Sequence, residues 1–459
     1  MGHAATSPGG SALVDLPAFI DGQPVGSGQV RLLLMCAAVL FVDGFDTQAI
    51  GYVAPALALE WKLPRGALGP VFSASLAGLM LGALLLGPLA DRLGRKRIIV
   101  LSTLAFGLGT LATVFATDTT SLLLIRFATG LGLGGAMPNA VAMTAEFSPH
   151  RRRATMVMAM FCGFSVGAAL GGLIAAAMIP AFGWRSVFVV GGMAPLLLCP
   201  VLVTGLPESV RFLALSGGAD DRIAATLGRL FPQRAFPPGT RFGADEPRLR
   251  GIPVAHLFDQ GRGGVTVLFW VVFFMSLLDL YFLSNWLPTV LNDLGASVSV
   301  AAAVGAMLQV GGVAGTLLLG RVIDRFSFRA LALTYVAASV AIVVVGYSSH
   351  SIGLAAVAIF CAGFCIVGGQ IASNALAATF YPTQMRATGV GWALGVGRAG
   401  SIIGPLIGGV LLAQQWEARP LFAAAAVPAL IAAAAAWGLS GAVRARDAAQ
   451  PAVAIGRSA

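Results

Sequence analysis

The chain contains twelve long apolar runs separated by short polar stretches. A membrane-spanning helix needs about 20 mostly apolar residues, and each run approaches or exceeds that length. Hydrophobic residues make up 57% of the chain and charged residues only 10%, against about 25% charged residues in a soluble protein. The sequence therefore predicts an all-α integral membrane protein. The runs cover residues 32–58, 67–90, 98–117, 121–143, 154–180, 185–206, 264–290, 298–320, 328–347, 351–379, 387–413 and 418–442.

The two halves of the chain repeat each other at a constant offset of 233 residues, as from Asp46 to Asp279. So many matches without a gap indicate two related six-helix bundles, and transporters with such parallel repeats bind substrate near the bilayer midplane and expose it alternately to each side. Spaced glycines at 163, 167 and 171, and at 400, 404 and 408, are typical of close helix packing. Other matches pair Gly87 with Gly320, Asp91 with Asp324, Arg92 with Arg325, Phe147 with Phe380, and Arg153 with Arg386.

The repeat and the composition predict a domain layout. We expect a disordered tail at 1–30, bundles at 31–206 and 263–442, a linker without a folded domain at 207–262, and a second tail at 443–459. No signal peptide is visible at the start. Most of the 29 Lys and Arg residues fall on one side of the twelve spans, which predicts that both termini and the linker are cytoplasmic. The net charge of +10 therefore reflects topology rather than nucleic-acid binding.

Two acids interrupt the first apolar run, at Asp43 and Asp46. A charged side chain at the bilayer centre is costly, so these residues must face protein or a water-filled cavity. Their spacing places them on nearly the same helical face. Intramembrane acids are candidates for proton or ion handling, although a structural ion pair is an open alternative.

Two arginines lie inside spans, Arg126 in the fourth and Arg398 in the eleventh. Arginine stays ionised in proteins, so each needs an anionic partner. Asp46 or a substrate carboxylate can serve Arg126, unless that side chain reaches the interface instead. Arg398 lies deeper, and its planar fork of donors suits a carboxylate. We expect Asp43, Asp46 and Arg126 to couple protons, and Arg398 and Arg126 to bind substrate.

Further polar and aromatic residues lie within the spans and are candidates for contact with substrate. Buried polar groups must find partners across helices or in a ligand. Aromatic side chains can also belong to the interfacial belts of the membrane, an alternative that stays open for Trp286. The candidates are Tyr281, Asn285, Trp286, Gln370, Asn374, Trp392 and the third membrane acid, Asp279.

Short basic loops follow the second and eighth spans, GPLADRLGRKR and GRVIDRFSFRA. Charge pairs and helix dipoles in such a loop can hold neighbouring helix ends together. We expect a gating role for the charged residues of these loops, or topology fixing by the basic residues alone. Glu146 and Arg386 follow the fourth and tenth spans and are further gating candidates, with a simple charge cluster as the alternative for Glu146. The loop candidates are Asp91, Arg92, Arg95, Asp324 and Arg325.

The five cysteines all fall within apolar runs and are interpreted as small hydrophobic residues. Their number is odd and no Cys/His spacing indicates a metal site. No nucleophile–base constellation is visible either. We therefore expect no metal, no cofactor and no enzymatic activity.

Several segments resemble the aromatic acid:proton symporters of the major facilitator superfamily. They include DGFDTQAIGYVAPAL, the loop GPLADRLGRKR, RFATGLGLGGAMPNA, LPESVRFL, YFLSNWLPTVL and FYPTQMRATGVGWALGVGRAGSIIGP. The resemblance covers nearly the whole chain and is strongest to 4-hydroxybenzoate/protocatechuate transporters. It implies proton-driven import of an aromatic carboxylate across the bacterial inner membrane, by a protein that we expect to be a monomer.

The alternatives are a carrier for another organic anion, a drug-exporting antiporter, or a membrane sensor that binds aromatic acids without transporting them. The resemblance also implies that eight charged residues matter for transport: Asp43, Asp46, Asp91, Arg126, Glu146, Asp324, Arg386 and Arg398. Asp279 departs from the pattern, because an aliphatic residue is expected there in the 4-hydroxybenzoate branch. This acid leaves the exact substrate open.

Overall fold

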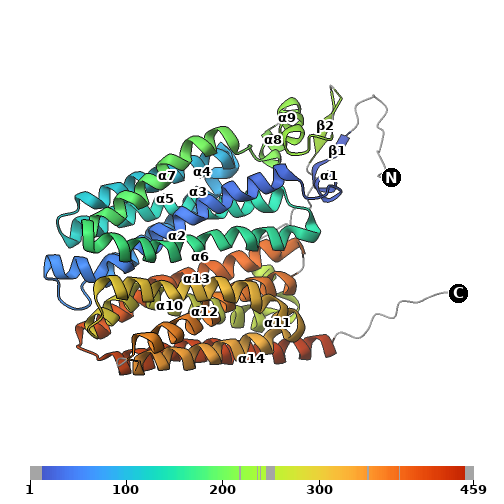
Figure 1. Ribbon diagram of the computed structural model, residues 1–459. Helices are drawn as coiled ribbons and strands as arrows, with labels where there is room; N and C mark the ends of the chain where they lie inside the picture. The colour runs from blue at the N-terminus through green and yellow to red at the C-terminus, as the bar shows by residue number, and fades with distance from the viewer. Residues whose placement is uncertain are drawn as a thin grey trace. The chain divides into compact units, whose positions relative to one another are not determined.

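The computed structural model describes residues 13–216, 219–234, 236, 237, 239–243, 254–348, 351–381 and 383–449. Within these ranges it does not describe the side chains of residues 154, 260, 320–327, 383, 384, 386, 387 and 445–449. Twelve helical segments in the described part are long and apolar enough to cross a membrane. The predicted all-α membrane architecture is therefore confirmed (Figure 1).

The helices of the first half are α2 to α7, and those of the second half are α10 to α14. α11 includes two candidate spans, Val298–Leu319 and Phe328–Tyr347, which the sequence had separated by a loop. The bounds are α2 Ser27–Trp61, α3 Gly69–Leu93, α4 Arg95–Ala112, α5 Thr119–Glu146, α6 His150–Phe182, α7 Arg185–Gly205, α10 Gly263–Asp293, α11 Val298–Tyr347, α12 Ile352–Phe380, α13 Thr383–Ala413 and α14 Ala418–Ala449.

The chain forms two compact units whose border does not follow the midpoint of the sequence. The first unit comprises Met1–Arg248, Leu283–Val310 and Pro405–Trp416. The second comprises Leu249–Phe282, Gly311–Gly404 and Glu417–Ala459. The last part of α10, the start of α11 and the end of α13 thus belong with the first unit, whereas the sequence placed the division at residues 207–262.

Glycines at equivalent positions of the repeat make equivalent contacts inside each unit. A Cβ added at Gly78 of α3 would meet the carbonyl of Phe127 in α5, and one at Gly311 of α11 would meet the carbonyl of Phe360 in α12. Both pairs are related by the same offset of 233 residues. Only a residue without a side chain lets two backbones approach this closely, so the repeat in the sequence is a repeat in packing.

The two predicted glycine seams behave in the same way. Gly163 and Gly167 of α6 face the backbone of α2, where any Cβ would meet the carbonyls of Ala37 and Phe41. Gly400 of α13 faces the carbonyl of Phe274 in α10, which is Phe41 displaced by the repeat. The first and fifth spans of each half are therefore held at backbone distance, and the acids of α2 and α10 lie on helices fixed in this manner.

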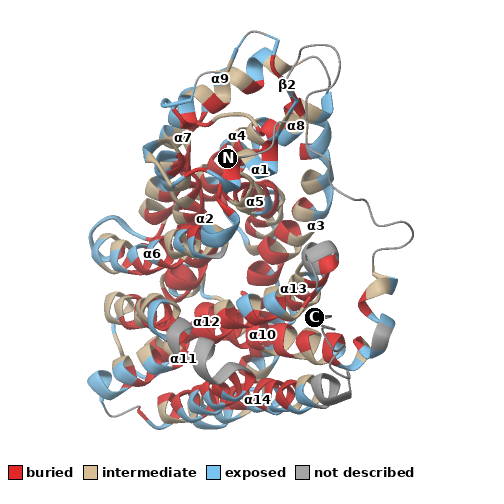
Figure 2. Cartoon of the chain, turned by 90° about the vertical axis from the view of Figure 1, so that its right-hand side faces the viewer, coloured by how far each residue is buried: buried red, intermediate tan, exposed pale blue. Residues whose placement is uncertain are grey.

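Most helices have one buried and one exposed side, as α14 shows (Figure 2). The exposed sides carry large apolar residues such as Leu84, Leu197 and Val357, each more than half exposed. In water such surfaces would be unfavourable, but in a bilayer they contact acyl chains. Polar groups with no access to lipid lie on the buried sides instead.

The polar ends of the first half contain more folded structure than the sequence indicated. β1 (Leu13–Asp15) pairs in parallel with β2 (Arg241–Gly243), and α1 (Leu16–Asp21), α8 (Val210–Ser216) and α9 (Asp220–Leu230) lie beside them. Phe19 packs edge-on against Phe231 and Phe236. The prediction that the tail and the linker lack folded structure is therefore wrong for these residues, because a small aromatic cluster joins two segments more than 200 positions apart.

Candidate functional site

Asp46 and Arg126 form a fully buried ion pair in the first unit. The two terminal nitrogens of the Arg126 guanidinium, Nη1 and Nη2, donate to the Asp46 carboxylate at 3.0 Å, and both side chains are 0% exposed. One nitrogen also donates to the backbone carbonyl of Asp46 at 3.1 Å. This two-pronged geometry is the strongest form of arginine–carboxylate contact, and it joins α2 to α5.

Other groups complete the surroundings of this pair. The Thr110 hydroxyl of α4 donates to Asp46 Oδ1 at 2.5 Å, and Arg126 reaches the Ser75 hydroxyl of α3 at 3.4 Å. The Phe188 ring of α7 lies 5.8 Å from the guanidinium carbon. Breaking a buried pair leaves an uncompensated charge in a low-dielectric site, so any step that separates Asp46 from Arg126 needs a proton or another ion to replace the lost partner.

Asp43 lies one helical turn before Asp46 and is also fully buried. The Thr47 hydroxyl donates to Asp43 Oδ1 at 3.0 Å. The two acids of α2 thus have different hydrogen-bond partners, although their spacing puts them on nearly one face. Arg126 pairs with Asp46, so the charge of the arginine neutralises Asp46 in particular.

Asp279 of α10 is the corresponding acid in the second unit, and it is 1% exposed. Its Oδ1 atom has no hydrogen-bond partner among the described residues. Ser276, one turn earlier, contacts Gln370 of α12, whose Nε2 atom is also unsatisfied within the described part. Buried polar atoms normally have partners, so this cluster has hydrogen-bonding capacity for water or a ligand.

Two further groups belong to this polar cluster of the second unit. The Asn374 side chain, one turn after Gln370 on α12, has an unsatisfied Oδ1 atom within the described chain. The Tyr335 hydroxyl of α11 contacts Ser373 at 3.3 Å and interacts electrostatically with Asp279. Three of the predicted substrate residues, Asp279, Gln370 and Asn374, therefore share one region.

Arg398 of α13 also belongs to the second unit. It donates to the Tyr281 hydroxyl at 3.2 Å, and it is partly buried. Tyr281 is on α10, two residues after Asp279, so the same helix carries a hydroxyl next to the arginine and a buried acid.

Trp286 and Asn285 belong to the first unit, as does Arg126. Trp286 packs edge-on against Phe72 of α3 at 5.0 Å and donates through Nε1 to the Pro405 carbonyl at 2.9 Å. Trp392 is 47% exposed and stacks on Trp270. These tryptophans stabilise helix contacts or face outward, and Trp392 does not lie on the Arg398 side of α13.

Glu146, a predicted gating residue, connects three elements at one end of the first unit. Arg95 donates to its carboxylate at 2.6 Å, the Ser209 hydroxyl donates at 2.8 Å, and the Arg211 backbone N–H donates at 2.9 Å. This network ties the end of α5 to the start of α4 and to α8. Glu146 therefore holds the polar segment after α7 in place. The sequence had left two alternatives for this residue, a gating role and a simple charge cluster.

The remaining gating candidates are exposed or outside the description. The Asp91 carboxylate is 74% exposed and lies 3.9 Å from Arg95, while Arg92 is exposed. Asp324, Arg325 and Arg386 lie outside the residues whose side chains the structure describes.

Sequence reasoning missed three polar side chains near the acids. Thr110 and Ser75 complete the Asp46–Arg126 pair. Gln48, two residues after Asp46, is 1% exposed, and both of its side-chain polar atoms are unsatisfied among the described residues. Short hydroxyl side chains are common in membrane helices, so only the packing of α2, α3 and α4 identifies these partners.

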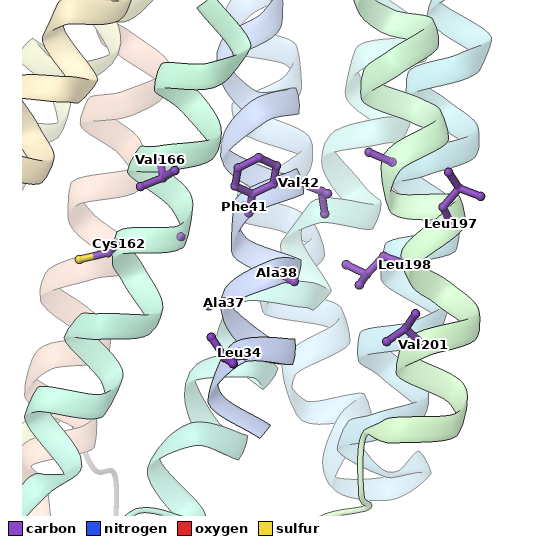
Figure 3. Close-up of a pocket in the computed structure, with 12 residues that line it drawn as sticks. Leu34, Ala37, Ala38, Phe41, Val42, Cys162, Val166, Leu197, Leu198 and Val201 are labelled. Carbon is purple, nitrogen blue, oxygen red and sulfur yellow. The ribbon is translucent and has the colours of Figure 1, made fainter. Parts of the chain in front are cut away.

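A cavity of about 610 Å³ opens between α6 and α7, with α2 as its floor (Figure 3). Its lining is apolar, and Leu34 and Leu197 at its rim are 63% and 69% exposed. Phe41 and Val42 precede Asp43 on α2, yet neither acid lines the cavity. It is therefore a lipid-facing groove and not the place where the buried charges act. Across the described residues, no three His, Cys, Asp or Glu side chains could hold a metal ion together.

The family model described as the Major Facilitator Superfamily matches residues 36–243 and 269–456. The chain is 44% identical to a 4-hydroxybenzoate transporter of Pseudomonas putida over 94% of this chain and 96% of that protein. It is 42% identical to a gallate transporter of Pseudomonas putida, over 92% of this chain and 94% of that protein.

Solved structures show the same fold at low identity. The xylose transporter of E. coli, in a partially occluded inward-open conformation, matches with a TM-score of 0.69 and 16% identity, over 90% of this chain and 98% of that one. A bacterial homologue of the human lysosomal transporter Spinster matches with a TM-score of 0.64 and 19% identity, over 93% and 98%. The chain thus belongs to the Major Facilitator Superfamily of transporters, which are not enzymes, and is closely related to 4-hydroxybenzoate transporters.

Proposed function

We propose that this transporter imports a hydroxylated aromatic carboxylate together with protons, by alternating access. The observation that carries the proposal is the buried Asp46–Arg126 pair of the first unit, while the second unit has its own buried acid, Asp279, and its own arginine within a span, Arg398. Intramembrane charges of this kind mark ion and substrate pathways. The relatives named for 4-hydroxybenzoate and gallate supply the substrate class.

The substrate carboxylate binds Arg398 in this proposal. The Tyr281 hydroxyl already accepts from Arg398 at 3.2 Å and orients the guanidinium for a second, anionic partner. A planar guanidinium recognises a carboxylate through two parallel hydrogen bonds. The unsatisfied atoms of Asp279, Gln370 and Asn374 then accept from and donate to the ring hydroxyl groups. A substrate that satisfies these buried groups is favoured over one that leaves them unpaired.

Asp46 carries the coupled proton in this proposal, and Asp43 assists it. While Arg126 is bound, the Asp46 carboxylate is neutralised without a proton. Protonation of Asp46 removes the charge that holds Arg126, so proton binding and a rearrangement of α2 against α5 become linked. Asp43, one turn away, is placed to exchange the proton with water when the site opens.

The polar ends of the helices control opening. Glu146 and Arg95 fix the segment after α7, and we assign Asp91, Arg92, Asp324, Arg325 and Arg386 to the same task in the two repeats. The excess of basic residues predicted on this face supports a cytoplasmic location for the face and for both termini in a bacterial cell. The chain acts as a monomer in the inner membrane.

Uptake into proteoliposomes tests the proposal. The purified protein is reconstituted, an inward pH gradient is imposed, and labelled 4-hydroxybenzoate, protocatechuate, gallate and benzoate are offered. We expect accumulation of at least one hydroxylated acid that collapses when a protonophore is added. Accumulation that does not depend on the pH gradient would contradict proton coupling. No uptake of any aromatic acid would contradict the proposed substrate class.

Arg398→Lys separates charge from geometry at the substrate site. The lysine keeps a positive charge but loses the planar fork, so we expect KM to rise with little change in the pH dependence of uptake. Arg419→Lys is the matched control, because Arg419 stacks on Tyr347 outside the polar cluster. Equal KM values for the two variants would contradict the assignment of Arg398.

A further inference from the structure

A basic pocket lies at one end of the first unit, away from the buried acids. It has a volume of about 330 Å³ and is bounded by the start of α4, the residues after α7 and one side of α9. Four cationic side chains and one carboxylate line it. The charged lining residues are Lys96, Arg97, Glu208, Arg222 and Arg229.

The carboxylate in the pocket, that of Glu208, accepts hydrogen bonds from backbone N–H groups. Glu208 Oε1 accepts from the N–H groups of Lys96 and Ser209, both at 3.0 Å. Gly94, with φ at +99°, leaves room for this carboxylate, because an added Cβ would lie 2.5 Å from Glu208 Oε2. Glu208 therefore caps the first turn of α4 and does not reach across the pocket to the arginines.

None of the four cations forms a salt bridge with another of the residues that the structure describes. Lys96 interacts electrostatically with both Glu208 and Arg229. Like charges gathered in one concave site repel one another and raise the local concentration of anions. The pocket thus has an excess of positive charge, with four cationic side chains against the one carboxylate of Glu208.

The fold, and not chance clustering, brings these cations together. α9 is amphipathic, and Ile223 and Leu227 bury one side of it in the core beneath. Arg222, Thr226 and Arg229 follow at helical spacing on the other side and face the pocket. Asp220 accepts from the Phe242 N–H at 3.0 Å, which anchors the start of α9.

The pocket lies where two membrane spans end. α4 begins at Arg95, and α7 ends at Gly205, directly before Leu206 and Pro207 in the lining. This is the level of lipid headgroups on the face of the protein that carries most of its basic residues. Arginine and lysine bind phosphate through charge-assisted hydrogen bonds, and basic pockets beside membrane helices suit anionic headgroups.

We propose that this pocket binds the phosphate group of an anionic phospholipid in the adjacent leaflet. The phosphate lies between Arg222, Arg229 and Lys96, while the acyl chains extend along α4 and α7. The bound lipid joins the linker helix α9 to the transmembrane bundle through charges that would otherwise repel. A soluble phosphate could supply the same chemistry, but the position at the ends of two spans favours the lipid.

Lipid retention by the full-length protein tests this proposal. Native mass spectrometry counts phosphatidylglycerol molecules that remain on the detergent-solubilised protein, for the wild type and for Arg222→Gln/Arg229→Gln. Each cation near an anionic headgroup contributes to the free energy of lipid binding. Loss of two cations should therefore weaken the binding of phosphatidylglycerol to the double variant by about 30-fold. We expect one tightly retained phosphatidylglycerol to disappear from the double variant.

Arg151→Gln/Arg241→Gln is the matched control, because it removes the same charge from exposed positions outside the pocket. Equal lipid loss in both double variants would overturn the proposal, as would retention of phosphatidylcholine in place of phosphatidylglycerol. If Arg222→Gln/Arg229→Gln fails to fold, Arg222→Lys/Arg229→Lys replaces it and should retain the lipid.

Thermal unfolding with inorganic phosphate distinguishes the two sources of the anion. Phosphatidylglycerol should raise the unfolding temperatures of the wild type and of the control variant. The unfolding temperature of Arg222→Gln/Arg229→Gln should rise much less. Inorganic phosphate at equal phosphorus concentration should have no such selective effect. If inorganic phosphate stabilises the wild type as well as the lipid does, the lipid assignment is wrong.

Discussion

Asp46 in α2 and Asp279 in α10 occupy equivalent positions of the internal repeat, yet their surroundings are opposite. Asp46 accepts from Arg126 and Thr110. Asp279 has an oxygen without a hydrogen-bond partner in the described chain. Both acids are buried and both lie on helices held at backbone distance by glycines. The packing of the two halves is therefore conserved within the chain, whereas the electrostatics are not.

The sequence of the second half explains this difference. The offset of 233 residues that relates Asp46 to Asp279 also relates Arg126 to Ile359, Thr110 to Val343 and Ser75 to Leu308. Each group that stabilises Asp46 or its arginine thus has an apolar counterpart. In the other direction, Arg398 corresponds to Ser165. The first half thus has a closed ion pair, whereas the acid of the second half has an oxygen without a hydrogen-bond partner in the described chain.

The largest expected effect comes from removing the arginine of the closed pair. Arg126→Leu leaves Asp46 buried without its cation, and breaking a buried pair in this way costs about 3–5 kcal/mol. We expect a clearly lower unfolding temperature and no uptake. Differential scanning fluorimetry in detergent measures the first quantity and proteoliposome uptake the second.

A double variant sharpens this result. Asp46→Asn/Arg126→Gln removes both charges, so stability should recover toward that of the wild type, while gradient-driven uptake stays absent. If stability does not recover, the loss in Arg126→Leu arises from packing and not from an uncompensated charge.

A smaller effect is expected at the hydroxyl that only the first half possesses. Thr110→Val removes the hydrogen bond to Asp46 at 2.5 Å, and hydrogen bonds to charged groups contribute about 1.5–3 kcal/mol. Thr103→Val is the control, because the Thr103 hydroxyl is buried but donates only to its own helix, at the Ile99 carbonyl. Unfolding temperatures should fall more for Thr110→Val, and an equal fall would show that the contact with Asp46 is unimportant.

The smallest change in stability is expected at Asp279. Asp279→Asn preserves shape and removes no ion pair that the structure describes, so the free energy of unfolding should change by less than about 1 kcal/mol. If Asp279 accepts from ring hydroxyl groups, the ratio of uptake of protocatechuate to benzoate should fall. Competition between the two labelled acids measures this ratio. A large loss of stability with an unchanged ratio would mean that Asp279 has a structural partner.

Much of the architecture could be predicted from the sequence, because apolar runs and repeated glycines are local signals. The twelve spans and the close helix packing at Gly167 followed from run length and spacing, whereas the identity of the partner helix, α2, did not. The need of Arg126 for an anionic partner could be predicted from its charge, but Asp46 was only one of the partners that the sequence allowed. The roles of Thr110 and Ser75 could not be predicted, since they depend on which faces of three helices meet.

The small folded region at the polar end was missed for a related physical reason. β1 and β2 have three residues each, and they pair across more than 200 positions. Elements this short carry little periodicity. Their stability comes from the packing of Phe19 against Phe231 and Phe236, which no local pattern reveals.

In our proposal the proton is handled by the closed pair in the first half and not by the acid in the second. This is tested by the uptake of 4-hydroxybenzoate into proteoliposomes of the Asp46→Asn and Asp279→Asn variants, with and without an inward pH gradient. We expect Asp46→Asn to abolish the stimulation of uptake by the gradient and Asp279→Asn to retain it. Loss of the stimulation in Asp279→Asn, with its retention in Asp46→Asn, would show that the proton is handled by the second half instead.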